Sequence, residues 1–246
     1  SITDPSYEGQ ILVITFPLVG NYGVPDRNLR DEFVEQLPRY FESSKIHIAG
    51  LVISHYTEEY SHWLAKSSLG QWLKQENIPA IYGVDTRALT KHLRDSGSML
   101  GRLSLQKPSV STIDLAEIDS QWESNFDIPD WVDPNVQNLV AKVSTKEPKL
   151  FVPPTDNDQV KLQTGPDGKV LRILAVDVGL KYNQIRCFVK RGVELLVVPW
   201  DYDFTKEQYD GLFISNGPGD PSVLATLSER LSSVVESKKT PIFGIC

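Results

Sequence analysis

The sequence predicts an α/β fold in which a mixed β/α domain is followed by a domain built on a parallel sheet. From residue 171 onward, short apolar runs alternate with amphipathic segments, which is typical of parallel strands connected by helices. Residues 1–145 instead hold β-branched apolar runs separated by longer polar loops. Residues 146–170, between these two parts, are rich in proline and glycine and are predicted to be a linker.

The first domain is expected to contain two apolar strands and three helices. The strands are predicted at 11–16 and 46–53, and the helices at 29–41, 69–75 and 86–94. We expect the first helix to be interrupted or kinked at Pro38, because proline lacks the N–H that a helix needs. The third helix is expected to begin after Asp85, a good helix-capping residue. Residues 105–135 are polar and irregular, and no secondary structure is predicted there.

In the second domain, strands and helices follow one another at short spacing. The predicted order is strand 171–176, helix 182–190, strands 194–198 and 211–214, helix 223–235 and strand 242–245. Apolar residues recur at helical spacing on the last helix: Val223, Leu227, Leu231, Val234 and Val235. Because open α/β sheets bind ligands at the carboxyl ends of their parallel strands, we expect a site after strands 211–214 and 242–245.

A rigid loop follows the strand at 211–214. It reads Ser215-Asn216-Gly217-Pro218-Gly219-Asp220-Pro221, in which the prolines restrict the backbone and the glycines allow unusual dihedral angles. Such a loop can direct backbone N–H groups toward a developing negative charge. Taken alone, it could equally be an ordinary turn.

The last residues form an apolar strand that ends in Gly244-Ile245-Cys246. This is the first half of a nucleophile elbow, the sharp strand-to-helix turn that exposes a Ser or Cys above an α/β sheet. Gly244 is expected to give the turn room, and a cysteine at the start of a following helix loses its proton more easily. The alternative is a buried structural cysteine. The glycine-rich loop one helix earlier favours the nucleophile.

These motifs resemble those of the class I, triad-type glutamine amidotransferases, and more narrowly the glutaminase portion of carbamoyl-phosphate synthetases. Four further stretches share the resemblance: residues 3–7, 17–23, 83–87 and 177–183. It implies that residues 1–145 are the small-subunit N-terminal domain, truncated at its start. Residues 171–246 would be the first part of a flavodoxin-like class I glutamine amidotransferase domain, truncated after the nucleophile. The amino-acid sequences of residues 11–23, 131–140 and 182–186 most resemble those of fungal multifunctional pyrimidine-pathway proteins. In these proteins the glutaminase is fused to the synthetase and to aspartate carbamoyltransferase.

The resemblance implies a thiol mechanism acting on L-glutamine. Cys246 would attack the side-chain amide carbon, ammonia would leave, and water would hydrolyse the glutamyl thioester. By the same resemblance, Gly217 and Gly219 line the glutamine pocket, and one of them supplies an oxyanion donor. Ser6 contacts the glutamine from the first domain; its alternative is a capping hydroxyl in an Asp-Pro-Ser turn. The family's catalytic His and Glu lie downstream of the nucleophile, so the isolated stretch 1–246 is expected to be inactive.

The ammonia is expected to pass to a carbamoyl-phosphate synthetase domain or subunit, for carbamoyl phosphate formation in de novo pyrimidine biosynthesis. ATP, magnesium and bicarbonate would belong to that synthetase, and the glutaminase step needs no cofactor and no metal. Two other functions remain open. One is a non-catalytic interaction or regulatory module that braces the synthetase, although Cys246 argues against it. The other is a γ-glutamyl hydrolase on the same fold, which would have no use for residues 83–87 or the rest of the first domain.

Composition excludes several classes of protein. The 246 residues carry a formal net charge of −7, which argues against a nucleic-acid surface. No apolar run approaches the ~18 residues of a membrane span. Cys187 and Cys246 are the two cysteines, which argues against a disulfide framework and suits the cytoplasm. The four histidines are interpreted as structural, without the clustering of a zinc site: His47, His55, His62 and His92.

Overall fold

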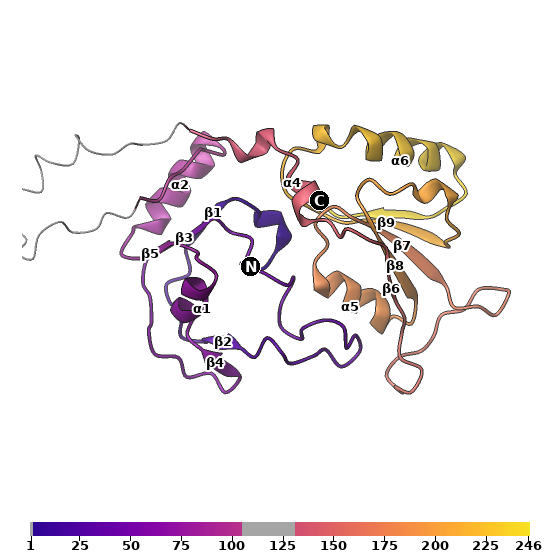
Figure 1. The fold of residues 1–246 in the computed structure, drawn as a ribbon, viewed down its shortest axis with the longest axis horizontal. Coiled ribbons are helices and arrows are strands. Elements are labelled where there is room, and N and C mark those ends of the chain that lie inside the picture. The colour runs from indigo at the N-terminus through magenta and orange to yellow at the C-terminus, as the bar shows by residue number, and fades with distance from the viewer. Residues whose placement is uncertain (1, 105–130) are drawn as a thin grey trace, which may run out of the picture.

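The computed structural model describes residues 2–104 and 131–246, which form two packed lobes, each built around a sheet (Figure 1). The N-terminal lobe has a parallel sheet of order β1-β3-β5 and a two-stranded antiparallel sheet β2-β4. The C-terminal lobe has a five-stranded sheet of order β10-β9-β7-β8-β6, in which β10, β9, β7 and β8 are parallel neighbours. The predicted α/β class, with a parallel sheet in the second part, is confirmed.

The N-terminal lobe buries β3 in its core. Its strands are β1 (Ile11–Ile14), β2 (Val24–Pro25), β3 (Gly50–Ile53), β4 (Ala65–Ser67) and β5 (Ala80–Ile81). Its helices are the 3₁₀ turn η1 (Pro5–Tyr7), α1 (Leu69–Gln75) and α2 (Thr86–Ser96). The side chains of Ser68 and Asp85 accept N–H bonds from the first turns of α1 and α2, so both predicted helices form with side-chain caps at their N-termini. The two predicted strands form over shorter ranges, as β1 and β3.

The helix predicted at 29–41 is wrong, because this segment folds as a chain of turns. The carboxylate of Asp31 accepts the N–H groups of Phe33 and Val34, which closes a turn where a helix would have continued. Val34 and Leu37 are buried in the core of the C-terminal lobe. Contacts with the other lobe therefore override the helical spacing of these apolar residues.

The C-terminal lobe has helices on both faces of its sheet. Its elements are η2 (Pro134–Val136), α4 (Leu139–Val143), β6 (Lys149–Phe151), β7 (Arg172–Asp177), α5 (Tyr182–Lys190), β8 (Glu194–Pro199), η3 (Phe204–Lys206), β9 (Gly211–Ile214), η4 (Pro221–Val223), α6 (Ala225–Ser237) and β10 (Ile242–Gly244). Ile185 of α5 packs on one face with Ala175 and Phe213, and Leu227 of α6 packs on the other with Leu174. Successive side chains of a strand point to opposite faces, and both faces are covered by helices. The sequences of these strands are therefore continuous apolar runs.

Two details differ from the predicted elements. Helix α6 begins only at Ala225, and Val223 and Val235 of the predicted apolar face are exposed. Strand β6 lies inside the range 146–170 and pairs antiparallel with β8 at the edge of the sheet. The linker itself and the domain boundaries stay predictions. The polar stretch around 105–135 lies, as far as residue 130, outside the described residues.

The two lobes are joined by a buried ion pair as well as by apolar contacts. Nε of Arg186, on α5, lies 3.0 Å from a carboxylate oxygen of Asp31, and both side chains are 8% exposed. The same guanidinium donates to the backbone carbonyls of Phe41, at 2.9 Å, and Pro38. The backbone N–H of Tyr182 donates to the carbonyl of Glu42. In the ranges 2–104 and 131–246, no helix is long and apolar enough to span a bilayer.

Candidate functional site

The carboxyl ends of three neighbouring parallel strands define the candidate site. Strand β9 pairs with β7 on one side and with β10 on the other, so the segments after these strands meet at one edge of the sheet. They begin at Val178, Ser215 and Ile245. The prediction that the glycine-rich loop and the Gly-x-Cys segment follow parallel strands is therefore confirmed, and the two strands are direct neighbours.

The glycine-rich loop lies directly against the segment that follows β7. A Cβ on Gly217 would come within 1.8 Å of the carbonyl oxygen of Val178, so only glycine fits this close approach. Gly219 has a φ of +79°, a left-handed conformation that favours glycine. The buried hydroxyl of Ser215 accepts the N–H of Val178 at 2.9 Å and donates to the carbonyl of Asn216. The loop is thus fixed by close backbone packing at Gly217 and by the hydrogen bonds of the Ser215 hydroxyl.

Cys246 is exposed and is not in a disulfide. The N–H of Ile245 donates to the carbonyl of Ile214, so the pairing with β9 continues beyond the end of β10. The nearest described atom to a Cβ on Gly244 would be that carbonyl oxygen, at 3.9 Å. The described residues therefore do not show the crowding that we expected at this glycine. The assignment of Cys246 as nucleophile stays a prediction.

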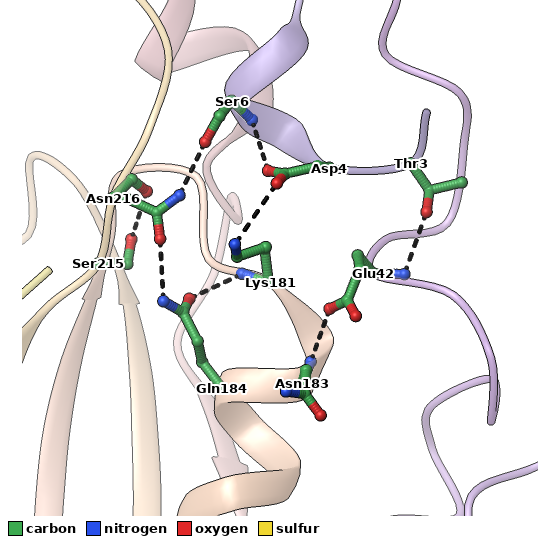
Figure 2. A network of polar contacts seen from close by, with 9 residues as sticks. All are labelled: Thr3, Asp4, Ser6, Glu42, Lys181, Asn183, Gln184, Ser215 and Asn216. Carbon is green, nitrogen blue, oxygen red and sulfur yellow. Dashed lines mark hydrogen bonds and ion pairs between the residues drawn. The ribbon is translucent and has the colours of Figure 1, made fainter. Parts of the chain in front are cut away.

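Ser6 reaches the loop from the N-terminal lobe (Figure 2). Its N–H donates to the carboxylate of Asp4, which caps the turn η1, so the Asp-Pro-Ser turn expected as an alternative is present. Its hydroxyl oxygen nevertheless points outward from that turn and accepts the side-chain N–H of Asn216 at 2.7 Å. The structure thus brings Ser6 against Asn216, the residue that precedes Gly217. The substrate contacts of Ser6 and Gly217 stay predictions.

Two residues of the site region were not predicted. Gln184, on the first turn of α5, donates from Nε2 to Oδ1 of Asn216 at 2.9 Å, and its Oε1 accepts the N–H of Lys181 at 2.9 Å. Nζ of Lys181 lies 3.4 Å from the carboxylate of Asp4, in the other lobe. Gln184 makes one half of a capping box, the bond from the N-cap N–H to the side chain three residues later. The Ser or Thr that completes this motif in a sequence is replaced by Lys181, so the sequence signal for Gln184 is only partial. The sequence holds no signal for its contact with Asn216.

Two buried ionisable groups around the lobe contact have shifted pKa values. Asp177, at the end of β7, accepts the N–H groups of Gly179, Leu180 and Thr145, and burial raises the pKa of its carboxyl. These bonds shape the turn after β7. His47 is buried, and burial lowers the pKa of its imidazole.

The imidazole of His47 has two polar partners. Its Nδ1 lies 2.6 Å from a carboxylate oxygen of Glu8, and its Nε2 lies 2.9 Å from the hydroxyl of Ser43. These partners account for both ring nitrogens, which supports the structural interpretation of this histidine. Within the described residues, no group of His, Cys, Asp and Glu has the arrangement of a metal site.

Comparison with known proteins identifies both lobes. Residues 1–103 match the family of the carbamoyl-phosphate synthase small chain, CPSase domain, and residues 174–246 match the class I glutamine amidotransferases. The whole chain is 78% identical over 247 residues to the multifunctional protein URA2 of Saccharomyces cerevisiae, covering 11% of that protein. It is 60% identical over 249 residues to the multifunctional protein pyr-3 of Neurospora crassa, covering 13% of that protein. The resemblance inferred from the motifs is confirmed.

The name of a third relative specifies ammonia. The chain is 45% identical over 246 residues to the mitochondrial carbamoyl-phosphate synthase [ammonia] of Mus musculus, covering 14% of that protein. The chain therefore spans 11–14% of the length of these relatives. Each of these three relatives matches the whole of this chain, so both lobes are included.

Proposed function

Because residues 1–103 belong to the carbamoyl-phosphate synthase small-chain family and residues 174–246 to the class I glutamine amidotransferase family, we propose that this chain is the glutaminase component of a glutamine-hydrolysing carbamoyl-phosphate synthetase. It would release ammonia from L-glutamine and deliver it to a synthetase. The observation that carries the proposal is Cys246, a cysteine placed after β10 beside the glycine-rich loop after β9.

In the proposed mechanism, the thiolate of Cys246 attacks the amide carbon of glutamine and forms a tetrahedral oxyanion. Ammonia leaves, and water then hydrolyses the glutamyl thioester. Backbone N–H groups of the loop at Gly217 and Gly219 would stabilise the oxyanion, and Ser6 would hold the substrate from the other lobe. The rigid packing of Gly217 against Val178 supports this role, because oxyanion donors act best when they are fixed before the reaction.

The partner and the pathway belong to the same proposal. The names of the two fungal relatives describe multifunctional proteins, of which this chain covers 11% and 13%, and this supports further activities fused in the same polypeptide. These would be the synthetase and, as the motif resemblance implies, aspartate carbamoyltransferase. ATP, magnesium and bicarbonate would act on that synthetase, in de novo pyrimidine biosynthesis. Two free cysteines without a disulfide are consistent with a cytoplasmic protein.

A second candidate function is a non-catalytic module that braces the synthetase. The observation that favours it is the name of the mouse relative, which specifies ammonia although the chain is 45% identical to it. Similarity over this chain therefore does not by itself indicate glutamine as the nitrogen donor. The residue at 246 separates the two functions, because thioester chemistry requires the thiol.

The variant Cys246→Ser tests the proposal in the intact natural protein. We expect it to lose glutamine-dependent carbamoyl phosphate formation and to keep the ammonia-dependent reaction, because only ammonia release needs the thiol. Labelling by a glutamine-mimicking chloroketone should disappear in the same variant. Undiminished glutamine-dependent activity in Cys246→Ser would contradict the proposal, and a wild-type protein active only with ammonia would favour the bracing module.

A further inference from the structure

Three hydrogen bonds connect the backbone of the C-terminal lobe to Ser6 of the N-terminal lobe (Figure 2). The N–H of Lys181 donates to Oε1 of Gln184 at 2.9 Å. Nε2 of Gln184 donates to Oδ1 of Asn216 at 2.9 Å, and Nδ2 of Asn216 donates to Oγ of Ser6 at 2.7 Å. We call these four residues the amide relay.

The direction of every bond in the amide relay follows from its first donor. A backbone N–H can only donate, so the atom of Gln184 that faces Lys181 must be the oxygen. The amide nitrogen of Gln184 then faces Asn216 and donates to its oxygen. The amide nitrogen of Asn216 consequently faces Ser6, and the hydroxyl oxygen of Ser6 must act as an acceptor.

This direction leaves the hydroxyl proton of Ser6 unused. The backbone N–H of Ser6 donates to Asp4 and its carbonyl accepts from Gln10, but within the described part of the chain its hydroxyl donates to no residue. The hydroxyl of a serine can donate one hydrogen bond while it accepts another. The matching partner is an acceptor oxygen, and glutamine carries such oxygens on its carboxylate and on its amide.

We infer that Gln184 is a positioning residue for glutamine: it fixes the orientation of the Asn216 amide, and thereby keeps the Ser6 hydroxyl proton available for the substrate. This inference rests on the proposed function, because it assigns a role within the same site. Gln184 is itself buried, with 9% of its surface exposed. It acts on Ser6 through Asn216.

The chain allows the direction of the relay to be reversed with almost no change of shape. In Gln184→Glu, one carboxylate oxygen still accepts the N–H of Lys181, but the other can only accept, so the Asn216 amide must turn. Its oxygen then faces Ser6 and takes the hydroxyl proton. Asn216→Asp also makes the Ser6 hydroxyl proton unavailable to the substrate, because its second carboxylate oxygen accepts that proton directly.

Three further variants separate direction from packing and from charge. Gln184→Met keeps the length of the side chain but removes its hydrogen bonds, which leaves the Asn216 amide free to keep its native orientation. Gln208→Glu makes the same chemical change as Gln184→Glu at an exposed residue outside the amide relay. Ser6→Ala removes the hydroxyl, both alone and combined with Gln184→Glu.

The test measures glutamine hydrolysis by the intact natural protein, with ammonia-dependent synthesis as the check that each variant is folded. Gln184→Glu and Asn216→Asp should each lower kcat/KM for glutamine by roughly 10- to 100-fold, chiefly through KM, because a hydrogen bond to the substrate is lost. Gln184→Met should lose less, and Gln208→Glu should stay near wild type. Ser6→Ala combined with Gln184→Glu should be no worse than Ser6→Ala alone.

Three results would overturn the inference: wild-type kinetics in Gln184→Glu or Asn216→Asp, a greater loss in Gln184→Met than in Gln184→Glu, or losses that multiply in the double variant. The last two would mean that Gln184 matters only for packing. Failure of the proposed function would look different, because the wild-type protein itself would then release no ammonia from glutamine.

Discussion

The buried ion pair between the lobes offers the sharpest test of what holds them together. Replacing Arg186 by Met would leave the carboxylate of Asp31 buried without its cation, and the carbonyls of Pro38 and Phe41 without their donor. Removing one partner of a buried ion pair destabilises the surrounding structure by about 3–5 kcal/mol. We expect an effect of this size because both side chains are only 8% exposed.

Hydrogen exchange followed by mass spectrometry can measure this effect locally. The N–H groups of Asp31, Leu37 and Arg39 donate within the segment that Arg186 holds, so peptides covering residues 29–42 report its opening. A loss of about 3–5 kcal/mol corresponds to exchange that is faster by roughly two to four powers of ten. The double variant Asp31→Asn with Arg186→Met should recover part of the protection, because it no longer buries an unpaired charge.

A matched substitution on the surface provides the control. Arg172 lies 2.8 Å from the carboxylate of Glu194, but its side chain is 42% exposed. Arg172→Met should therefore change exchange near β8 by no more than about 1 kcal/mol. The reasoning would be refuted if Arg186→Met altered exchange as little as Arg172→Met does, or if the double variant were as unprotected as Arg186→Met alone.

Two further predictions concern the buried imidazole and the glycines of the loop. Burial lowers the pKa of His47, so the unfolded state takes up the proton first as the pH falls. Stability should be constant above pH ~6.5 and decline below it, and His47→Gln should flatten that decline in denaturant titrations; an unchanged pH profile would contradict this. Gly217→Ala should lower glutaminase activity more than Gly219→Ala, because its Cβ would lie 1.8 Å from the carbonyl of Val178, whereas Gly219→Ala introduces only backbone strain of about 1–2 kcal/mol. The reverse order in steady-state kinetics would argue against the close loop contact.

The parts of the fold that the sequence predicted well are those with local causes. Helices α1 and α5 form over the predicted ranges 69–75 and 182–190, and α2 begins directly after Asp85, at Thr86, as predicted. Side-chain caps and the spacing of apolar residues act within one or two turns, so they can be read from neighbouring positions. The segment 29–41 failed because Val34 and Leu37 pack against a sheet whose first strand lies more than a hundred residues later.

The candidate site also contains residues that the sequence could place and residues that it could not. The glycine-rich loop and Cys246 could be placed together from the sequence, because adjacent parallel strands bring their carboxyl ends to one edge. Ser6 lies 210 positions from Asn216, and only family resemblance brought it into the site. Gln184 reads as an ordinary capping residue, since its second hydrogen bond depends on how α5 packs beside β9.

The hydrogen bond between Ser6 and Asn216 is a result of the lobe contact rather than its cause. A single hydrogen bond contributes about 1 kcal/mol net, which is too little to hold two lobes in one arrangement. Burying a side chain such as Val34 or Leu37 contributes about 1.5–3 kcal/mol each. The ion pair of Arg186 adds little net stability, because both charges regain water when the lobes separate, but it disfavours any arrangement that would bury one charge without the other. The position of Ser6 in the site is therefore determined by the segment 29–42, which seats the N-terminal lobe on α5. A substitution in that segment, although remote from Cys246, should act on glutamine binding by moving Ser6 away from the loop.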